Sequence, residues 1–203
     1  MLGEKVRFVT VAMNGQVYSK ILLFMSFVDE YVMAMKIAGQ HFESQGYDYR
    51  ECLIRLLEKL PDPSQITMFD EIATANCGQT IMIQNTVSLW YSASAEAHIL
   101  HYVLTTHHKG REISAECYED FSIALQKLKD AVQEELHICA YCQQSDFMSD
   151  GSEELRHGWY CFRNVNEDRS LPWFQRIEDF EKAIPNVDAL HWCPKFCKSE
   201  RSL

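Results

Sequence analysis

The stretch that decides the N-terminal fold is residues 6–23, which read VRFVTVAMNGQVYSKILL. Val6 to Ala12 is rich in β-branched residues, as strands are, and Val17 to Leu23 continues the pattern. Between them, Asn14-Gly15 suits the two positive-φ positions of a type I′ turn. These residues predict a β-hairpin, which is the clearest strand signal in the chain.

Five later segments carry apolar residues at spacings of three and four, the period of one helix face. A capping pattern starts the first of them at Ser26, and Pro61 ends the second. The segments are residues 26–42, 48–60, 66–72, 85–104 and 114–136. Residues 80–83 instead predict a single strand that joins the hairpin. The sequence therefore predicts an α+β body over residues 1–136, in which a β-hairpin or small antiparallel sheet is packed by four or five helices.

The character of the sequence changes at His137. Residues 137–203 hold five of the eight cysteines and three of the four tryptophans, and few of their apolar residues recur at regular spacing. A loop-rich segment of about 65 residues has too small a core to stay folded without a further constraint such as a bound metal ion. We therefore expect a second, cysteine-rich module over residues 137–203 that is held by a structural zinc ion (Zn2+).

Two close pairs of cysteines are the predicted zinc ligands. Two residues separate Cys139 from Cys142, and three separate Cys193 from Cys197. Such spacings let both thiolates of a pair reach one tetrahedral ion at about 2.3 Å, and two pairs complete its coordination shell. Four thiolates saturate the zinc, so the site would shape a surface and perform no chemistry of its own.

Two alternatives to these pairs stay open. In the first, another residue of the module, Cys161, His157 or His191, replaces one of the cysteines. The finger-like set of this kind is Cys139, Cys142, His157 and Cys161. In the second alternative, all five cysteines are ordinary buried thiols that bind no metal.

Two groups of residues are candidates for catalysis. His98 and His101 would share one face of the predicted helix 85–104 and could hold a metal, but the H-E-x-x-H spacing is missing. Cys77 is a candidate nucleophile with His41, His98 or His101 as its base, but no known protease signature surrounds it. The sequence also lacks a Gly-rich phosphate loop, a G-x-S-x-G elbow and a dinucleotide fingerprint. The chain is therefore predicted not to be an enzyme, with a cysteine- or metal-dependent hydrolase as the alternative.

Acidic side chains outnumber basic ones by 29 to 19, which gives a net charge of −10. Lys and Arg form no stripe, and this disfavours binding of nucleic acid through its phosphates. The sequence predicts a non-enzymatic regulatory or inhibitory protein that binds a protein partner. The alternative hypothesis is an acidic inhibitor that imitates nucleic acid and so blocks the binding site of a nucleic-acid-binding protein.

The N-terminus lacks the charged region, apolar stretch and cleavage site of a secretory signal. The most apolar run, Ile21 to Val28, is eight residues long, whereas a membrane span needs about 20. We therefore expect a cytoplasmic protein without a membrane span, whose cysteines are thiols or metal ligands before they are disulfides. The identity of the partner and the oligomeric state are not predicted.

Overall fold

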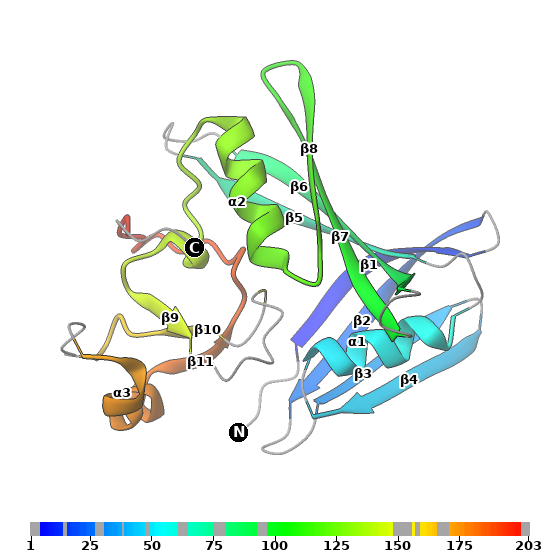
Figure 1. Ribbon diagram of the computed structural model, residues 1–203, viewed down its shortest axis with the longest axis horizontal. Coiled ribbons are helices and arrows are strands. Elements are labelled where there is room, and N and C mark those ends of the chain that lie inside the picture. The colour runs from blue at the N-terminus through cyan, green and yellow to red at the C-terminus, as the bar shows by residue number, and fades with distance from the viewer. Residues whose placement is uncertain are drawn as a thin grey trace.

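An eight-stranded antiparallel sheet dominates the N-terminal part of the computed structural model (Figure 1). The strand order across the sheet is β4-β3-β2-β1-β5-β6-β7-β8. The strands are β1 (Lys5–Met13), β2 (Gln16–Ser26), β3 (Tyr31–Ile37), β4 (Gln40–Gly46), β5 (Gln65–Ala73), β6 (Thr80–Ser92), β7 (Ala97–His108) and β8 (Arg111–Tyr118). The structure describes residues 5–13, 16–26, 31–37, 39–47, 49–60, 65–74, 80–92, 97–147, 156, 159–165 and 171–199.

The predicted hairpin is confirmed, because β1 and β2 pair antiparallel from Met13 opposite Gln16. The predicted turn residues, Asn14-Gly15, lie outside the described residues. The predicted strand over residues 80–83 is also confirmed as the start of the longer β6. However, β6 pairs with β5 and β7 and not with the hairpin, which reaches it only through β5.

The predicted fold class, a small sheet packed by four or five helices, is wrong. Three of the five predicted helices are strands: residues 26–42 fall in β2, β3 and β4, residues 66–72 fall in β5, and residues 85–104 span β6 and β7. The protein is instead built on a large antiparallel sheet with few helices among the residues that the structure describes.

The error at β3 and β7 has a physical reason, which is that burial along these strands alternates with a period of two. In β3, Met35 and Ile37 are buried, and Lys36 between them is exposed. In β7, Leu100 and Leu104 are both buried. A spacing of four places two side chains on one face of a strand as well as on one face of a helix. The apolar spacing in residues 85–104 therefore did not distinguish the two structures.

Two of the predicted helices are confirmed and cover the sheet. α1 (Tyr49–Glu58) packs on β3 and β4, and α2 (Phe121–Val132) packs on β7 and β8 (Figure 1). α1 also contacts β6 and β7, which β2, β1 and β5 separate from β3 in the sheet order. One helix can touch both groups of strands only if the sheet curves around it.

The start of α2 differs from the prediction, since Ser114 lies in β8 and the helix begins at Phe121. Asp120 is the N-cap, and its Oδ1 accepts hydrogen bonds from the backbone N–H groups of Ser122 and Ile123 at 2.8 and 3.3 Å. An aspartate in this position satisfies backbone donors that the first helical turn leaves without partners. The cap therefore sets the start of the helix more sharply than the apolar stripe does.

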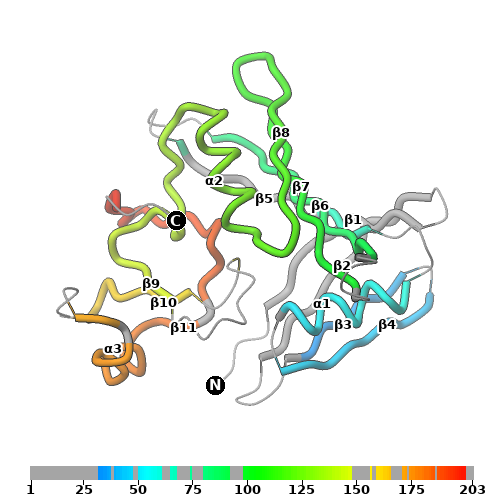
Figure 2. Tube along the Cα trace, in the orientation of Figure 1, coloured from blue at the N-terminus to red at the C-terminus, as the bar shows by residue number. Residues whose placement is uncertain are grey.

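A smaller three-stranded sheet with the order β11-β10-β9 follows α2. The elements of this region are η1 (Cys139–Tyr141), β9 (Ser145–Phe147), β10 (Trp159–Cys161), η2 (Trp173–Gln175), α3 (Ile177–Lys182) and β11 (Ile184–Val187). After β11 the chain returns to η1, and Figure 2 shows this last described segment in red beside it. Segments at the two ends of the region are thereby brought together.

One cluster of buried side chains joins this region to the large sheet. Phe121 and Leu125 of α2 belong to the same cluster as Tyr141, Trp159 and Leu190. The division into a body (1–136) and a module (137–203) stays a prediction, but the shared cluster means that each region buries apolar surface of the other. Among the described helices, none is both long and apolar enough to cross a membrane.

Candidate functional site

The two predicted cysteine pairs lie on neighbouring, antiparallel pieces of chain. Ile138 forms a β-bridge with Trp192, and Cys142 forms one with Lys198. Between these bridges the backbone N–H of Cys139 donates to the carbonyl oxygen of His191 at 2.9 Å. The structure therefore brings together two segments that lie about 50 residues apart in the sequence, as the zinc prediction requires.

Cys161 approaches the first cysteine pair through the small sheet. On β10 it stands opposite Ser145 of β9, and the Ser145 N–H donates to the carbonyl oxygen of Cys142 at 3.2 Å. The Ser145 hydroxyl also donates to the carbonyl oxygen of Cys139. Pairing of β9 with β10 thus places Cys161 beside the turn that carries Cys139.

Three of these cysteines line one pocket of about 280 Å³, which we call the cysteine pocket. They are Cys139, Cys161 and Cys193, and His191 and Asp188 line the same pocket. Of the four cysteines predicted first, the structure therefore brings Cys139 and Cys193 to one cavity. Cys142 is buried and Cys197 is exposed, and neither lines this pocket.

The Cys193 sulfur accepts two hydrogen bonds. The backbone N–H of Lys195 lies 3.4 Å from Sγ, and Nη1 of Arg163 lies 3.7 Å from it. The turn is closed by the Phe196 N–H, which donates to the carbonyl oxygen of Cys193 at 3.0 Å. Donors directed at a sulfur, one of them cationic, suit a thiolate that ligates a metal.

No three His, Cys, Asp or Glu side chains in the described part of the chain are grouped closely enough to hold a metal ion as they stand. His157, one of the alternative ligands, lies outside the described residues. The cysteine pocket is thus a shared cavity lined by thiols and not a finished coordination shell. Rotation about χ1 changes the position of a cysteine Sγ without moving the backbone.

The two candidate catalytic histidines of β7 do not share a face. His98 and His101 are three residues apart on a strand, so their side chains point to opposite faces of β7. Nδ1 of His98 lies 3.0 Å from a Glu58 oxygen of α1, and Nε2 of His101 lies 3.0 Å from a Glu116 oxygen of β8. On a helix the two histidines would share one face, whereas on β7 they lie on opposite faces of the strand.

The other two members of the predicted hydrolase site are His41 and Cys77. His41 lies on β4, is exposed, and its Nε2 is 3.2 Å from a Glu43 carboxylate oxygen. Cys77 lies outside the described residues.

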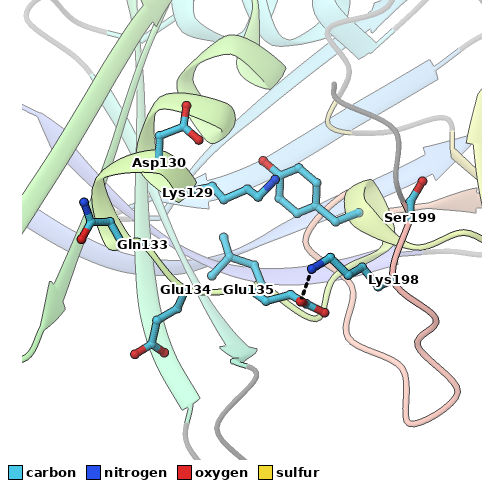
Figure 3. Close-up of a pocket in the computed structure, with 9 residues that line it drawn as sticks. Lys129, Asp130, Gln133, Glu134, Glu135, Lys198 and Ser199 are labelled. Atoms are coloured by element: carbon cyan, nitrogen blue, oxygen red, sulfur yellow. Dashed lines mark ion pairs between the residues drawn. The ribbon is translucent and has the colours of Figure 1, made fainter.

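A second pocket, of about 380 Å³, lies at the C-terminal end of α2, and we call it the α2-end pocket (Figure 3). It is lined by Lys129, Asp130, Gln133, Glu134, Glu135, Leu136, Tyr141, Lys198 and Ser199. No sequence motif reveals this pocket, because its residues come from two separate segments of the chain. Only the folded chain places the last turn of α2 opposite Lys198.

Tyr141 forms an apolar wall of the α2-end pocket. Its ring lies 4.2 Å from the Lys129 ammonium, measured to the ring centroid, and its hydroxyl donates weakly to Oε1 of Gln126 at 3.5 Å. Burial raises the pKa of the Tyr141 hydroxyl, and the Asp130 carboxylate raises it further. The hydroxyl therefore stays neutral in ordinary buffers.

Glu134 links this pocket to the turn between β7 and β8. Nζ of Lys109 lies 2.8 Å from Oε1 of Glu134, and Nε2 of His108 lies 3.1 Å from the same oxygen. The hydrogen bond from Lys109 lowers the pKa of Glu134 below its usual value of 4.5, and the positive charges of Lys109 and of protonated His108 act in the same direction. The ionised carboxylate thus ties the end of α2 to the large sheet.

A pH-dependent loss of stability is expected from this contact. A lowered pKa contributes stability that is present above pH 4.5 and is lost as the pH falls through the pKa of folded Glu134. Urea unfolding of Glu134→Gln should therefore show a deficit against the wild type that is largest near neutral pH and shrinks in acid. Glu112→Gln, at an exposed ion pair on β8, is the control. A deficit for Glu134→Gln that does not change with pH would contradict this account.

Comparison of the chain with protein-family models, curated proteins and solved structures finds no match.

Proposed function

We propose that this protein is a non-enzymatic binding protein whose C-terminal region is stabilised by one structural zinc ion. The ligands are Cys139, Cys161 and Cys193, with the fourth position filled by Cys142 or His191. The observation that carries the proposal is the cysteine pocket, in which side chains from three separate segments line one small cavity. Zinc is the metal that such thiolate sets hold in four-coordinate, closed sites.

This ligand set differs from the two cysteine pairs in the use of Cys161 in place of Cys197 and, if His191 is the fourth ligand, of His191 in place of Cys142. Cys161 lines the cysteine pocket together with Cys139 and Cys193, whereas Cys197 is exposed and lies outside it. Cys142 is a candidate for the fourth position because it shares the η1 turn with Cys139. His191 is the other candidate because it lines the pocket.

The surroundings of the pocket fit a charged metal–thiolate centre. Zinc with three thiolates and a histidine carries a net charge of −1, and with four thiolates it carries −2. The Lys195 N–H and the Arg163 guanidinium, both directed at the Cys193 sulfur, offset part of that charge. Such outer contacts orient metal ligands and tune their affinity.

The binding role rests on a second surface, the outer aromatic patch formed by Trp90, His101 and Tyr118. The Trp90 and Tyr118 rings meet edge to face with centroids 5.7 Å apart, and His101 stacks on Tyr118 at 4.5 Å. Trp90 of β6 and Tyr118 of β8 are about half exposed, and they stand opposite Ile99 and His101 of β7, on the sheet face opposite to that of buried Leu100. Exposed Trp and Tyr side chains are the types that most often anchor protein partners.

Cobalt substitution tests the ligand set. Full-length protein in which Co2+ replaces the metal should show thiolate-to-cobalt charge transfer and the intense visible bands of a tetrahedral centre. The variants Cys139→Ser, Cys161→Ser and Cys193→Ser should weaken or abolish the spectrum, and Cys197→Ser should leave it unchanged. Of Cys142→Ser and His191→Ala, the variant that loses the spectrum identifies the fourth ligand.

Two results would overturn the proposed set. If Cys197→Ser abolished the cobalt spectrum and Cys161→Ser did not, the two original cysteine pairs would hold the metal instead. If the wild-type protein showed no tetrahedral cobalt spectrum at all, the cysteine pocket would not be a metal site.

A further inference from the structure

The α2-end pocket contains an ammonium group without a carboxylate partner. No Asp or Glu of the described residues lies within 4.0 Å of the Lys129 Nζ, whose contact is the face of the Tyr141 ring. Figure 3 shows Lys129 and Lys198 reaching into the pocket, with Asp130 and Glu134 pointing away from its centre. Within the pocket, Lys129 is therefore the group best placed to receive an anionic ligand atom.

The other charged groups of the pocket already have partners. Nζ of Lys198 lies 2.7 Å from Oε2 of Glu135, and Oδ1 of Asp130 accepts from Nε2 of Gln126 at 2.8 Å. Glu134 contacts Lys109 and His108, which do not line the pocket. Lys129 thus stands out by its lack of an acidic neighbour within ion-pair distance.

The C-terminal end of α2 favours a positively charged group in the same pocket. The last carbonyl groups of a helix point outward without intrahelical partners and carry a partial negative charge. At this end the Gln133 N–H donates to the carbonyl oxygen of Lys129, and three carboxylates line the pocket around it. This environment opposes a multiply charged anion such as phosphate and favours a positive group beside the negative one.

We propose that the α2-end pocket binds a small zwitterion of the α-amino acid type. Its carboxylate would pair with the Lys129 ammonium, and its ammonium would face the carbonyl end of α2 and the Glu135 carboxylate. The Tyr141 ring and Leu136 provide apolar surface for the rest of the ligand. A volume of about 380 Å³ lies at the small end of ligand pockets, which suits a molecule of this size.

Thermal shift and calorimetry on the full-length, metal-containing protein test this proposal. Each standard amino acid is added separately at roughly 10 mM, and at least one should raise the melting temperature. For that amino acid, calorimetry should show binding at least about tenfold tighter than for acetate, methylammonium or phosphate alone. Lys129→Met should weaken the binding by about tenfold or more, because it removes the charge and keeps the stem over Tyr141.

The matched control is Lys182→Met, which removes an exposed lysine of α3 and should bind as the wild type does. The proposal fails if no amino acid shifts the melting temperature, or if the Lys129→Met protein binds as tightly as the wild type. It also fails if phosphate or acetate binds as well as the amino acid, since the pocket would then be a simple anion site. None of these outcomes depends on which residues hold the zinc.

Discussion

Removal of the proposed zinc ion by a strong chelator is expected to unfold much of the chain after α2. Apparent binding free energies of structural zinc are about 10–16 kcal/mol in small zinc-binding peptides, which is comparable to the whole stability of a domain, about 5–15 kcal/mol. Hydrogen exchange should therefore lose its protection in residues 138–147, 159–165 and 184–199, and the melting temperature should fall. Strands β1–β7 should keep their protection, since the large sheet has its own buried side chains.

Re-addition of zinc should restore the protection, and Cys197→Ser should respond to the chelator as the wild type does. Because Trp159 and Leu190 belong to the same buried cluster as Phe121, α2 is expected to lose part of its protection as well. If chelation left the exchange of every segment unchanged, zinc would have no structural role here.

The second large effect is expected at Phe121, where the two regions of the protein meet. Its ring is fully buried, lies edge to face with Tyr102 of β7 at 5.8 Å, and lies 5.3 Å from the Arg156 guanidinium. Phe121→Ala should lower the free energy of unfolding by about 3–5 kcal/mol, since it leaves a cavity beside a buried cation. Urea unfolding followed by circular dichroism measures this loss.

Ile123→Ala provides the matched control on the same turn of α2, because the Ile123 side chain is exposed. It should change the free energy of unfolding by only about 0.5 kcal/mol. Equal losses for the two variants would mean that α2 does not join the large sheet to the C-terminal region through Phe121.

The sequence predicted the elements that local residues determine. The hairpin β1–β2 follows from its β-branched residues and the Asn14-Gly15 turn sequence, and α2 follows from an apolar stripe that includes a spacing of three. For α2 this is decisive at Leu125 and Leu128, which are three residues apart and both buried. On a strand they would face opposite sides.

One failure arose at a spacing that is compatible with both structures. Leu100 and Leu104 are four residues apart and buried, and they lie on β7 because β6 and β8 pair with it on either side. Such pairing joins residues that are distant in the sequence, and a single sequence does not reveal it. The error at β7 also made His98 and His101 seem to share a face.

The sequence names candidate metal ligands, but it does not predict which of them lie around one cavity. Close spacing identified Cys139 and Cys193 as members of cysteine pairs. The approach of Cys161 depends on its position opposite Ser145 in the small sheet, which is a contact between distant residues. The α2-end pocket likewise forms because the chain brings Lys198 close to the end of α2. This is a contact between distant residues, and no sequence motif predicts it.

The most direct test of the account is the metal content of the full-length protein purified without a chelator, measured together with the reactivity of its cysteines. The account predicts one zinc ion per chain, with Cys139, Cys161 and Cys193 protected from alkylation until the zinc is removed. Exposed Cys197 should be alkylated from the start. A protein that contains no zinc, and whose Cys139, Cys161 and Cys193 react as readily as Cys197, would contradict it.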